Sequence, residues 1–298
     1  MGKTLSIVGP GRVGRTLGRR LRDLGWKIGV VSGQSLTTAR KGVQFIGAGR
    51  AQAGITSDLT ASSTILLTVP DDAIALVADE LAHVCGPALR GKIVLHTSGA
   101  LEAGVLEAVR SCGALAGSMH PLQTFSGVNS APLEGRIFAI EGDESAVRVA
   151  RGIARALGGI PHSISKEKKP LYHAAGSFGA AHVLALEEAG VQLLMSTGMK
   201  RREAVRALVS LTRQTLENYE KFGAPKAWTG PISRGDYGVV AAHEEALARY
   251  QPGFLESYQV LCSLAARVLS PNPQAAVAEL HRISANLQIP TKVEGEPA

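Results

Sequence analysis

Residues 7–18 of the chain read Ile7-Val8-Gly9-Pro10-Gly11-Arg12-Val13-Gly14-Arg15-Thr16-Leu17-Gly18. The stretch follows a short apolar run, and its glycines match the G-x-G-x-x-G pattern of a strand that turns into a helix. In that pattern the first glycine allows a tight turn, the second lets the backbone approach a pyrophosphate, and the third lets the helix pack on the strand. It predicts a dinucleotide-binding Rossmann domain, whereas a tight turn without a ligand is the alternative. The residues expected to contact the cofactor are Gly9, Pro10, Gly11, Arg12, Val13 and Gly14.

The end of the second predicted strand, 27–31, indicates which dinucleotide binds. NAD sites usually carry Asp or Glu about 20 residues after the glycines, where the carboxylate binds the ribose 2′-hydroxyl. This chain has Ser32 and Ser35 there and no carboxylate. The guanidinium groups of Arg12 and Arg40 could pair with a 2′-phosphate. We therefore expect NADP rather than NAD; ordinary solvated polar residues are the alternative for this segment.

The remaining sequence predicts two domains. Short apolar runs alternate with helical patterns in the first half, which favours a doubly wound, mainly parallel sheet. From about residue 167 strand signals are nearly absent and apolar residues recur at helical spacing. The expected fold is an α/β Rossmann domain over 1–165, followed by an all-α domain over 166–298. The further strands are expected at 64–69, 92–96, 114–119, 136–141 and 162–164.

Composition narrows the class of protein. The 298 residues are 45% hydrophobic and carry a net charge of +7, which suits an anionic cofactor and a small anionic substrate. The basic clusters lack interleaved aromatic residues, so we expect solvated helix faces rather than a nucleic-acid surface. The three cysteines lack metal-ligand spacing, and no apolar run is long enough to span a membrane. We expect a cytoplasmic protein with free thiols and no bound metal, nucleic acid or membrane.

Six segments carry a resemblance to a known family. Together they resemble a bacterial family of Rossmann-like oxidoreductases with an uncharacterised helical C-terminal domain, related to 6-phosphogluconate and prephenate dehydrogenases and to ketopantoate reductases. The resemblance implies that the helical domain builds a homodimer. The family usually has Asn where this chain has Ala181, which affects how a reacting oxygen would be held. The segments are Gly9 to Gly18, Val69 to Asp72, His96 to Ala100, His120 to Phe125, Tyr172 to Ala175 and Thr229 to Asp236.

Three loops are expected beyond the carboxyl ends of the strands, where open α/β sheets bind ligands. Val69 and Pro70 should pass beside the nicotinamide ribose. By resemblance to prephenate dehydrogenases, His120 is the first candidate for proton transfer, and Ser98 with Gly99 is expected to hold a carboxylate. A histidine suits this role because its free pKa of about 6.5 lets it donate or accept near neutrality.

The helical half contributes further candidates. His173 and Ser177 share one helix face at i, i+4 spacing, so both are candidates for the site, although helix packing is the alternative for Ser177. Arg234 could fork onto a substrate carboxylate and Asp236 could orient it, or the pair could fasten the loop.

Other polar residues are interpreted more simply. Tyr172 is expected in the core, and His96 is expected as a buried, hydrogen-bonded histidine. Lys166, Lys168 and Lys169 are interpreted as solvated charges at the domain junction. One of these lysines could instead reach the cleft, as a catalytic lysine does in ketopantoate reductases.

Together these features predict an NADP-dependent oxidoreductase that acts on a small keto or imino acid similar to ketopantoate. His120, His173 and Ser98 are its expected catalytic residues. Two alternatives stay open. A non-catalytic NADP-binding sensor or scaffold is favoured by Ala181, and a deazaflavin-linked NADP reductase would use the same cofactor fold.

Overall fold

The computed structural model describes residues 3–126 and 131–287. Contacts divide the chain into two compact units, Met1–His182 and Val183–Ala298. The division falls after the expected domain boundary at 165, because the helix that follows this boundary inserts its first side chain, Lys169, into the first unit. The boundary at 165 stays a prediction about independently folding domains.

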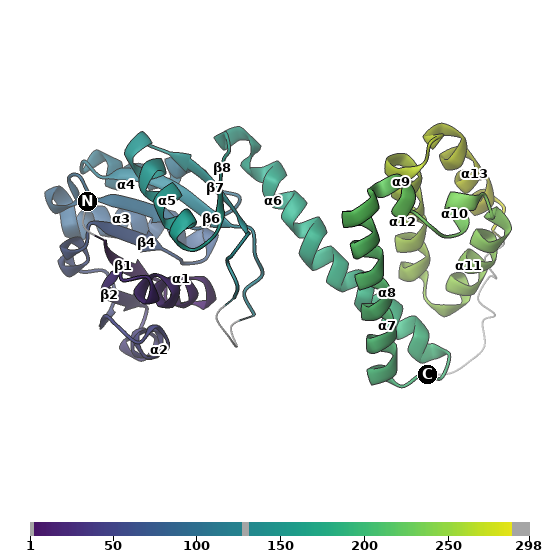
Figure 1. Cartoon of the computed structure of the whole chain (residues 1–298), viewed down its shortest axis with the longest axis horizontal. Coiled ribbons are helices and arrows are strands. Elements are labelled where there is room, and N and C mark those ends of the chain that lie inside the picture. Colours follow the sequence, from purple (N-terminus) through teal and green to yellow (C-terminus); the bar gives the residue numbers. More distant parts are fainter. Residues whose placement is uncertain (1–2, 127–130, 288–298) are drawn as a thin grey trace, which may run out of the picture. The chain divides into compact units, whose positions relative to one another are not determined.

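The first unit is built on an eight-stranded sheet in the order β3-β2-β1-β4-β5-β6-β7-β8 (Figure 1). Every neighbouring pair is parallel except β6 and β7, which are antiparallel. The doubly wound, mainly parallel α/β fold is therefore confirmed. The strands are β1 Thr4–Val8, β2 Lys27–Gly33, β3 Arg50–Ala53, β4 Thr64–Leu67, β5 Ile93–His96, β6 Leu115–Pro121, β7 Ile137–Gly142 and β8 Ile160–Ser163.

Helices cover both faces of this sheet. One face packs against apolar residues of α1 (Arg12–Asp23), α2 (Leu36–Ile46) and α5 (Glu144–Ala156). The other face packs against α3 (Ile74–Cys85) and α4 (Glu107–Ser111). Because both faces are covered, the central strands β4 and β5 are buried along their whole length, as their continuous apolar sequence requires.

The glycine-rich turn joins β1 to α1 in the way the pattern predicts. Gly9 has a φ of +88°, and a Cβ there would lie 2.7 Å from Val69 and 2.9 Å from the backbone of Thr68. A Cβ on Gly14 would overlap the side chain of Thr68, so helix and sheet approach too closely for any other residue. The turn thus brings the start of α1 against the loop after β4.

One strand was not expected from the sequence. β3 is a short edge strand of sequence Arg50-Ala51-Gln52-Ala53, and its side chains are only partly buried. It has no apolar alternation to reveal it and exists because the backbone of β2 offers hydrogen-bonding groups on that side.

The second unit is helical in its described residues, as expected for the C-terminal half. Its core is formed by Val240, Cys262, Ala266, Leu280 and Ile283, which come from three helices. In the described part of the chain, no helix is both long and apolar enough to cross a membrane. The helices are α7 Val183–Ser196, α8 Arg201–Phe222, α9 Ala224–Ala227, α10 Pro231–Arg234, α11 Tyr237–Tyr250, α12 Pro252–Leu269 and α13 Pro273–Ala285.

Candidate functional site

A pocket of about 350 Å³ lies at the carboxyl ends of β1, β2 and β4. In the strand order, the chain reverses its direction of winding between β1 and β4, which is where doubly wound sheets bind ligands. The lining includes the glycine-rich turn, the end of β2 and the loop after β4. The residues expected at the cofactor that line this pocket are Gly9, Pro10, Gly11, Ser32, Val69 and Pro70.

The first turn of α1 is suited to an anion. Gly11 is the N-cap residue, and no side chain caps the helix. No atom lies within 4 Å of the place where a Cβ on Gly11 would be. The uncapped N–H groups and the helix dipole at this end of α1 favour an anion such as a pyrophosphate, and Gly11 itself lines the first pocket.

Of the residues expected at the ribose end, Ser32 lines this pocket, whereas Ser35, Arg12 and Arg40 are not among its lining residues. The hydroxyl of Ser32 is buried and donates to the carbonyl of Gly54 at 2.6 Å. Ser35 caps α2 by accepting from the N–H of Thr38. Arg40 is exposed on α2, and Arg12 is exposed at the start of α1, where it makes one long 3.5 Å hydrogen bond to the carbonyl of Phe125. The two guanidinium groups are therefore the donors with capacity left for a phosphate.

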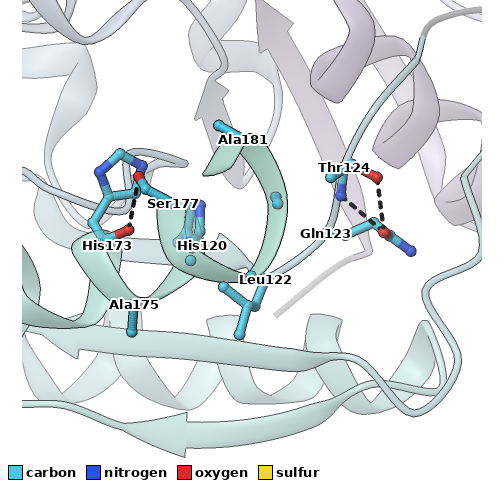
Figure 2. Close-up of a pocket in the computed structure, with 11 residues that line it drawn as sticks. His120, Leu122, Gln123, Thr124, His173, Ala175, Ser177 and Ala181 are labelled. Atoms are coloured by element: carbon cyan, nitrogen blue, oxygen red, sulfur yellow. Dashed lines mark hydrogen bonds between the residues drawn. The ribbon is translucent and has the colours of Figure 1, made fainter. Parts of the chain in front are cut away.

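A second pocket, of about 540 Å³, is formed by the loop after β6 and the helix α6 (Lys169–Ser177) with its continuation (Figure 2). The continuation, Phe178–His182, is a π-helical turn, and such turns occur frequently at functional sites. His120 lies at the pocket's base, and His173 and Ser177 face it from the helix. The full lining is His120, Leu122, Gln123, Thr124, His173, Ala175, Gly176, Ser177, Gly179, Ala180 and Ala181.

A chain of contacts connects the two pockets. Pro70 lines the first pocket, and its neighbour Asp71 accepts a 2.7 Å hydrogen bond from the hydroxyl of Ser98. A Cβ on Gly99 would lie 2.7 Å from the ring of His173 and 2.9 Å from Nε2 of His120. The absence of a side chain at Gly99 thus lets both histidines pack directly on the loop after β5.

Ser98 has a different place from the one expected. Besides donating to Asp71, its Oγ accepts from the backbone N–H groups of Ala100 and Leu101 at 3.2 and 2.9 Å. These bonds use the one donor and both acceptor positions of a hydroxyl. Ser98 therefore holds the loop in shape and keeps no hydrogen-bonding capacity for a substrate carboxylate.

His96 is a buried, hydrogen-bonded histidine, as interpreted from the sequence. Its Nδ1 accepts from the backbone N–H of Ser98, so Nε2 carries the proton and donates to the carbonyl of Glu102 at 3.2 Å. Burial, together with the charge of Lys169, lowers the pKa of His96 to about 3. The ring is neutral and fixes the start of the Ser98 loop.

The interpretation of Lys169 as a solvated charge is wrong. Its side chain is fully buried, and its Nζ donates to the carbonyl of Ser98 at 3.1 Å and to the hydroxyl of Ser118. Its third neighbour is the carboxylate of Glu141, at 3.6 Å. Burial lowers the pKa of Lys169 and raises that of Glu141, while the pairing opposes both shifts. Lys169 anchors α6 on the loop after β5, whereas Lys166 is exposed beside Glu102.

His120 is partly buried in this cluster. Burial, followed by the charges of His173 and Lys169, lowers the pKa of His120 to about 4. Its Nδ1 lies 2.9 Å from the hydroxyl of Tyr172, whose pKa burial raises to about 12. Tyr172 was expected in the core; it is half-buried and belongs to this cluster. Both groups are uncharged near neutral pH.

The remaining candidates separate into two groups. His173 and Ser177 line the second pocket from one helix face, and Ser177 bonds back to the carbonyl of His173 at 3.4 Å. Arg234 and Asp236 lie in the second unit, where they form an exposed ion pair of 2.8 Å. In the described residues no group of three or more His, Cys, Asp or Glu side chains has the arrangement of a metal site.

Comparison with known proteins identifies both halves. Residues 3–121 match the Rossmann-like domain, and residues 136–265 match the domain of unknown function DUF2520. The chain is a Rossmann-like protein with a DUF2520 domain. No curated protein matches it significantly.

Solved structures share the fold of this DUF2520 protein. A candidate NADP oxidoreductase from Bacteroides fragilis is 18% identical with a TM-score of 0.73, over 93% of this chain and 98% of that one. Protein TM1727 from Thermotoga maritima is 23% identical with a TM-score of 0.65, over 93% and 100%. A reductive aminase from Aspergillus terreus, in complex with NADPH and ethyl-5-oxohexanoate, is 17% identical with a TM-score of 0.63, over 90% and 94%. At these identities the likeness establishes the shared fold.

Sequence reasoning missed several residues of the DUF2520 protein's two pockets. Gln34, Thr38 and Glu80 line the first pocket, and Gln123 and Thr124 line the second. Glu80 follows the α3 helical pattern and carries no motif, so nothing in its sequence context points to a ligand. Gln123 and Thr124 come shortly after the end of β6 at Pro121, and this position after a strand end was the available signal.

Proposed function

We propose that this protein is an NADP-dependent oxidoreductase that transfers a hydride between NADPH and the carbonyl or imine carbon of a small keto or imino acid. The observation that carries the proposal is the contact chain from Pro70 through Asp71 and Ser98 to Gly99 and His120. It joins a pocket with the features of a dinucleotide site to a second pocket that holds a histidine able to exchange a proton. The fold shared with NADPH-bound oxidoreductases supports the same conclusion.

The cofactor would be held by this chain's own groups. The N–H groups at the start of α1 would bind the pyrophosphate, and Arg12 and Arg40 the 2′-phosphate. Val69 and Pro70 would lie against the nicotinamide ribose. When bound, NADPH supplies the hydride, and the protein supplies orientation and the proton.

Preference for NADPH over NADH is tested by fluorescence titration of both dinucleotides. We expect NADPH to bind at least about tenfold more tightly, since each charge-assisted pair contributes about 1.5–3 kcal/mol. Arg40→Gln should weaken NADPH binding and leave NADH binding unchanged. Equal affinities for the two dinucleotides would contradict the NADP assignment.

The class of substrate is a separate part of the proposal and has its own test. Among the described residues, His120 and His173 are the titratable groups that line the second pocket, and no lysine or arginine of that part of the chain lines it. The sequence offers Arg234 as the candidate for binding a substrate carboxylate. NADPH oxidation should be screened with 2-keto acids, ketopantoate first, and with their neutral amides. Keto acids should be preferred, and Arg234→Gln should raise KM more than it lowers kcat. NADPH binding without any turnover would favour the non-catalytic sensor.

We also propose that the second unit forms a homodimer. It exposes apolar side chains on α8 and α12, among them Leu216, Tyr219, Val260 and Val268, which are 55–68% exposed. Exposed apolar surface of this kind favours association. Light scattering at micromolar concentration should report twice the chain mass, and a monomer would contradict the proposal.

A further inference from the structure

His120 is held from one side by a single hydroxyl. Its Nδ1 lies 2.9 Å from Oη of Tyr172, the ring centroids are 5.5 Å apart, and the ring planes are nearly perpendicular at 89°. His120 comes from β6 and Tyr172 from α6, so the contact joins the sheet to the helix that lines the second pocket.

The other nitrogen of the ring has a different environment. Nε2 lies 2.9 Å from the position of a Cβ on Gly99, and among the described residues it has no hydrogen-bond partner. His120 lines the second pocket, whereas Tyr172 does not. Since Nδ1 is occupied by Tyr172, Nε2 is the nitrogen that a ligand in this pocket can reach.

We propose that Tyr172 is a positioning residue, whose hydroxyl donates to Nδ1 of His120 and so keeps the imidazole proton on Nε2, where it faces the substrate pocket. A neutral imidazole carries one proton, so a donor at Nδ1 decides the tautomer. The hydroxyl of Tyr172 has no other acceptor among the described residues. The tautomer itself is independent of the proposed function; its consequence for catalysis rests on that function.

The surroundings keep both groups uncharged. His173 and Lys169 from α6 and His96 from β5 are the titratable groups around His120, and burial with the first two lowers its pKa to about 4. Burial raises the pKa of Tyr172 to about 12. Near pH 7 the pair is therefore a neutral phenol that donates to a neutral imidazole.

This arrangement has a defined consequence for the proposed reduction. Bound NADPH would supply the hydride to the carbonyl carbon, and the π electron pair of the carbonyl would move to its oxygen. The Nε2–H bond of His120 breaks, and its proton bonds to that oxygen. Nδ1 takes the hydroxyl proton of Tyr172. Solvent water then supplies a proton to Nε2, and Nδ1 returns its proton to the tyrosine oxygen, which restores the starting tautomer. For an imine, nitrogen takes the place of oxygen.

The chain contains a matched control. Nδ1 of His243 lies 2.8 Å from Oη of Tyr258, with ring centroids 5.8 Å apart and an angle of 79° between the planes. This pair lies in the second unit, and His243 is exposed. Tyr258→Phe therefore removes the same type of bond without touching the proposed catalytic groups.

The test is nitrogen NMR of the full chain labelled with ¹⁵N in the imidazole rings, for the wild type, Tyr172→Phe and Tyr258→Phe. Spectra of His120→Gln and His243→Gln assign the two signals. We expect wild-type His120 to show a protonated Nε2 and a bare Nδ1, with no imidazolium until the pH falls to about 5. Tyr172→Phe should give a mixture of tautomers for His120 alone, and Tyr258→Phe should change His243 alone.

A wild-type His120 protonated on Nδ1 would overturn the proposal, as would a tautomer unchanged by Tyr172→Phe. The wild-type spectrum suffices for the first of these, even if the variant does not fold. With an active substrate, Tyr172→Phe should lower kcat about tenfold with little change in KM. The Nε2–H tautomer without any NADPH-dependent turnover would refute the proposed function and leave the role of Tyr172 in fixing the tautomer intact.

Discussion

Two histidine–tyrosine pairs in this protein have nearly the same geometry and different surroundings. His120–Tyr172 and His243–Tyr258 have Nδ1–Oη distances of 2.9 and 2.8 Å, and both are edge-on contacts. The first histidine lies at a strand end, lines a cavity and is close to Lys169. The second is exposed on α11, and its tyrosine comes from α12.

The comparison shows that a hydrogen-bonded histidine–tyrosine pair is not by itself evidence for a functional site. Burial lowers the pKa of His120, and the absence of a side chain at Gly99 leaves space beside Nε2. Tyr258 is also partly buried, and burial raises its pKa, yet its partner His243 faces solvent. Position at the carboxyl end of a parallel strand is what separates the two.

The largest expected difference is in turnover. His120→Gln should lower kcat about 100- to 10,000-fold, the usual contribution of a general acid or base, because the proton donor is lost. His243→Gln should leave kcat unchanged. Steady-state NADPH oxidation measures both, and NADPH affinity should stay within about twofold in each variant because neither residue lines the first pocket. Full activity of His120→Gln would remove the residue from the mechanism and make His173 the first candidate.

The next largest expected effect is on the free energy of unfolding, when the buried cation Lys169 near His120 is removed. Lys169→Met removes the buried cation that pairs with Glu141 and the donor to the Ser98 carbonyl, which should lower the free energy of unfolding by about 3–5 kcal/mol. Lys166→Met breaks only an exposed pair with Glu102 and should cost at most about 1 kcal/mol. Urea unfolding can be followed by Trp26 in a Trp228→Phe background, which reports on the first unit.

Losses of similar size for the two lysine variants would show that the burial of Lys169 has little energetic consequence. The role of Lys169 as the anchor of α6 would then be contradicted.

Stability should depend on pH through the buried histidines. The folded pKa values of His96 and His120 are lowered to about 3 and 4, below the unfolded value of 6.5, so the unfolded state binds more protons between these limits. The free energy of unfolding is therefore highest above pH 6.5, where both histidines are neutral in both states. It decreases as the pH falls toward 4, by up to about 1.4 kcal/mol per pH unit for each histidine. His120→Gln should reduce this slope in urea unfolding at pH 5 to 7.5. An equal slope in the wild type and His120→Gln would contradict the assignment.

The smallest expected effect concerns Gly99. A Cβ there would press on Nε2 of His120 and on the ring of His173, so Gly99→Ala should lower kcat/KM about tenfold by displacing the donor. Gly152→Ala is the matched control, since no atom lies within 4 Å of its Cβ position in α5, and it should stabilise the protein by about 0.5–1 kcal/mol. An active Gly99→Ala enzyme would show that this close contact is not needed.

The local sequence predicted the structure correctly where backbone freedom and apolar patterning within one segment decide it. The glycine pattern predicted the turn before α1, and apolar runs predicted all strands except the polar edge strand β3. Lys169 was misinterpreted because it follows two solvated lysines and looks like them. Nothing in a run of charges reveals which one the helix turns inward.

By itself, the sequence determined the α/β architecture, the glycine turn, the lack of a carboxylate at the end of β2 and the loops in which His96, Ser98 and His120 lie. These depend on backbone freedom and on apolar periodicity, which each segment carries alone. Only the tertiary structure decided that Ser98 is saturated, that Lys169 is buried and that Tyr172 faces Nδ1 of His120. Those outcomes depend on desolvation and on hydrogen bonds between residues far apart in the chain, and such contacts exist only once α6 packs on the sheet.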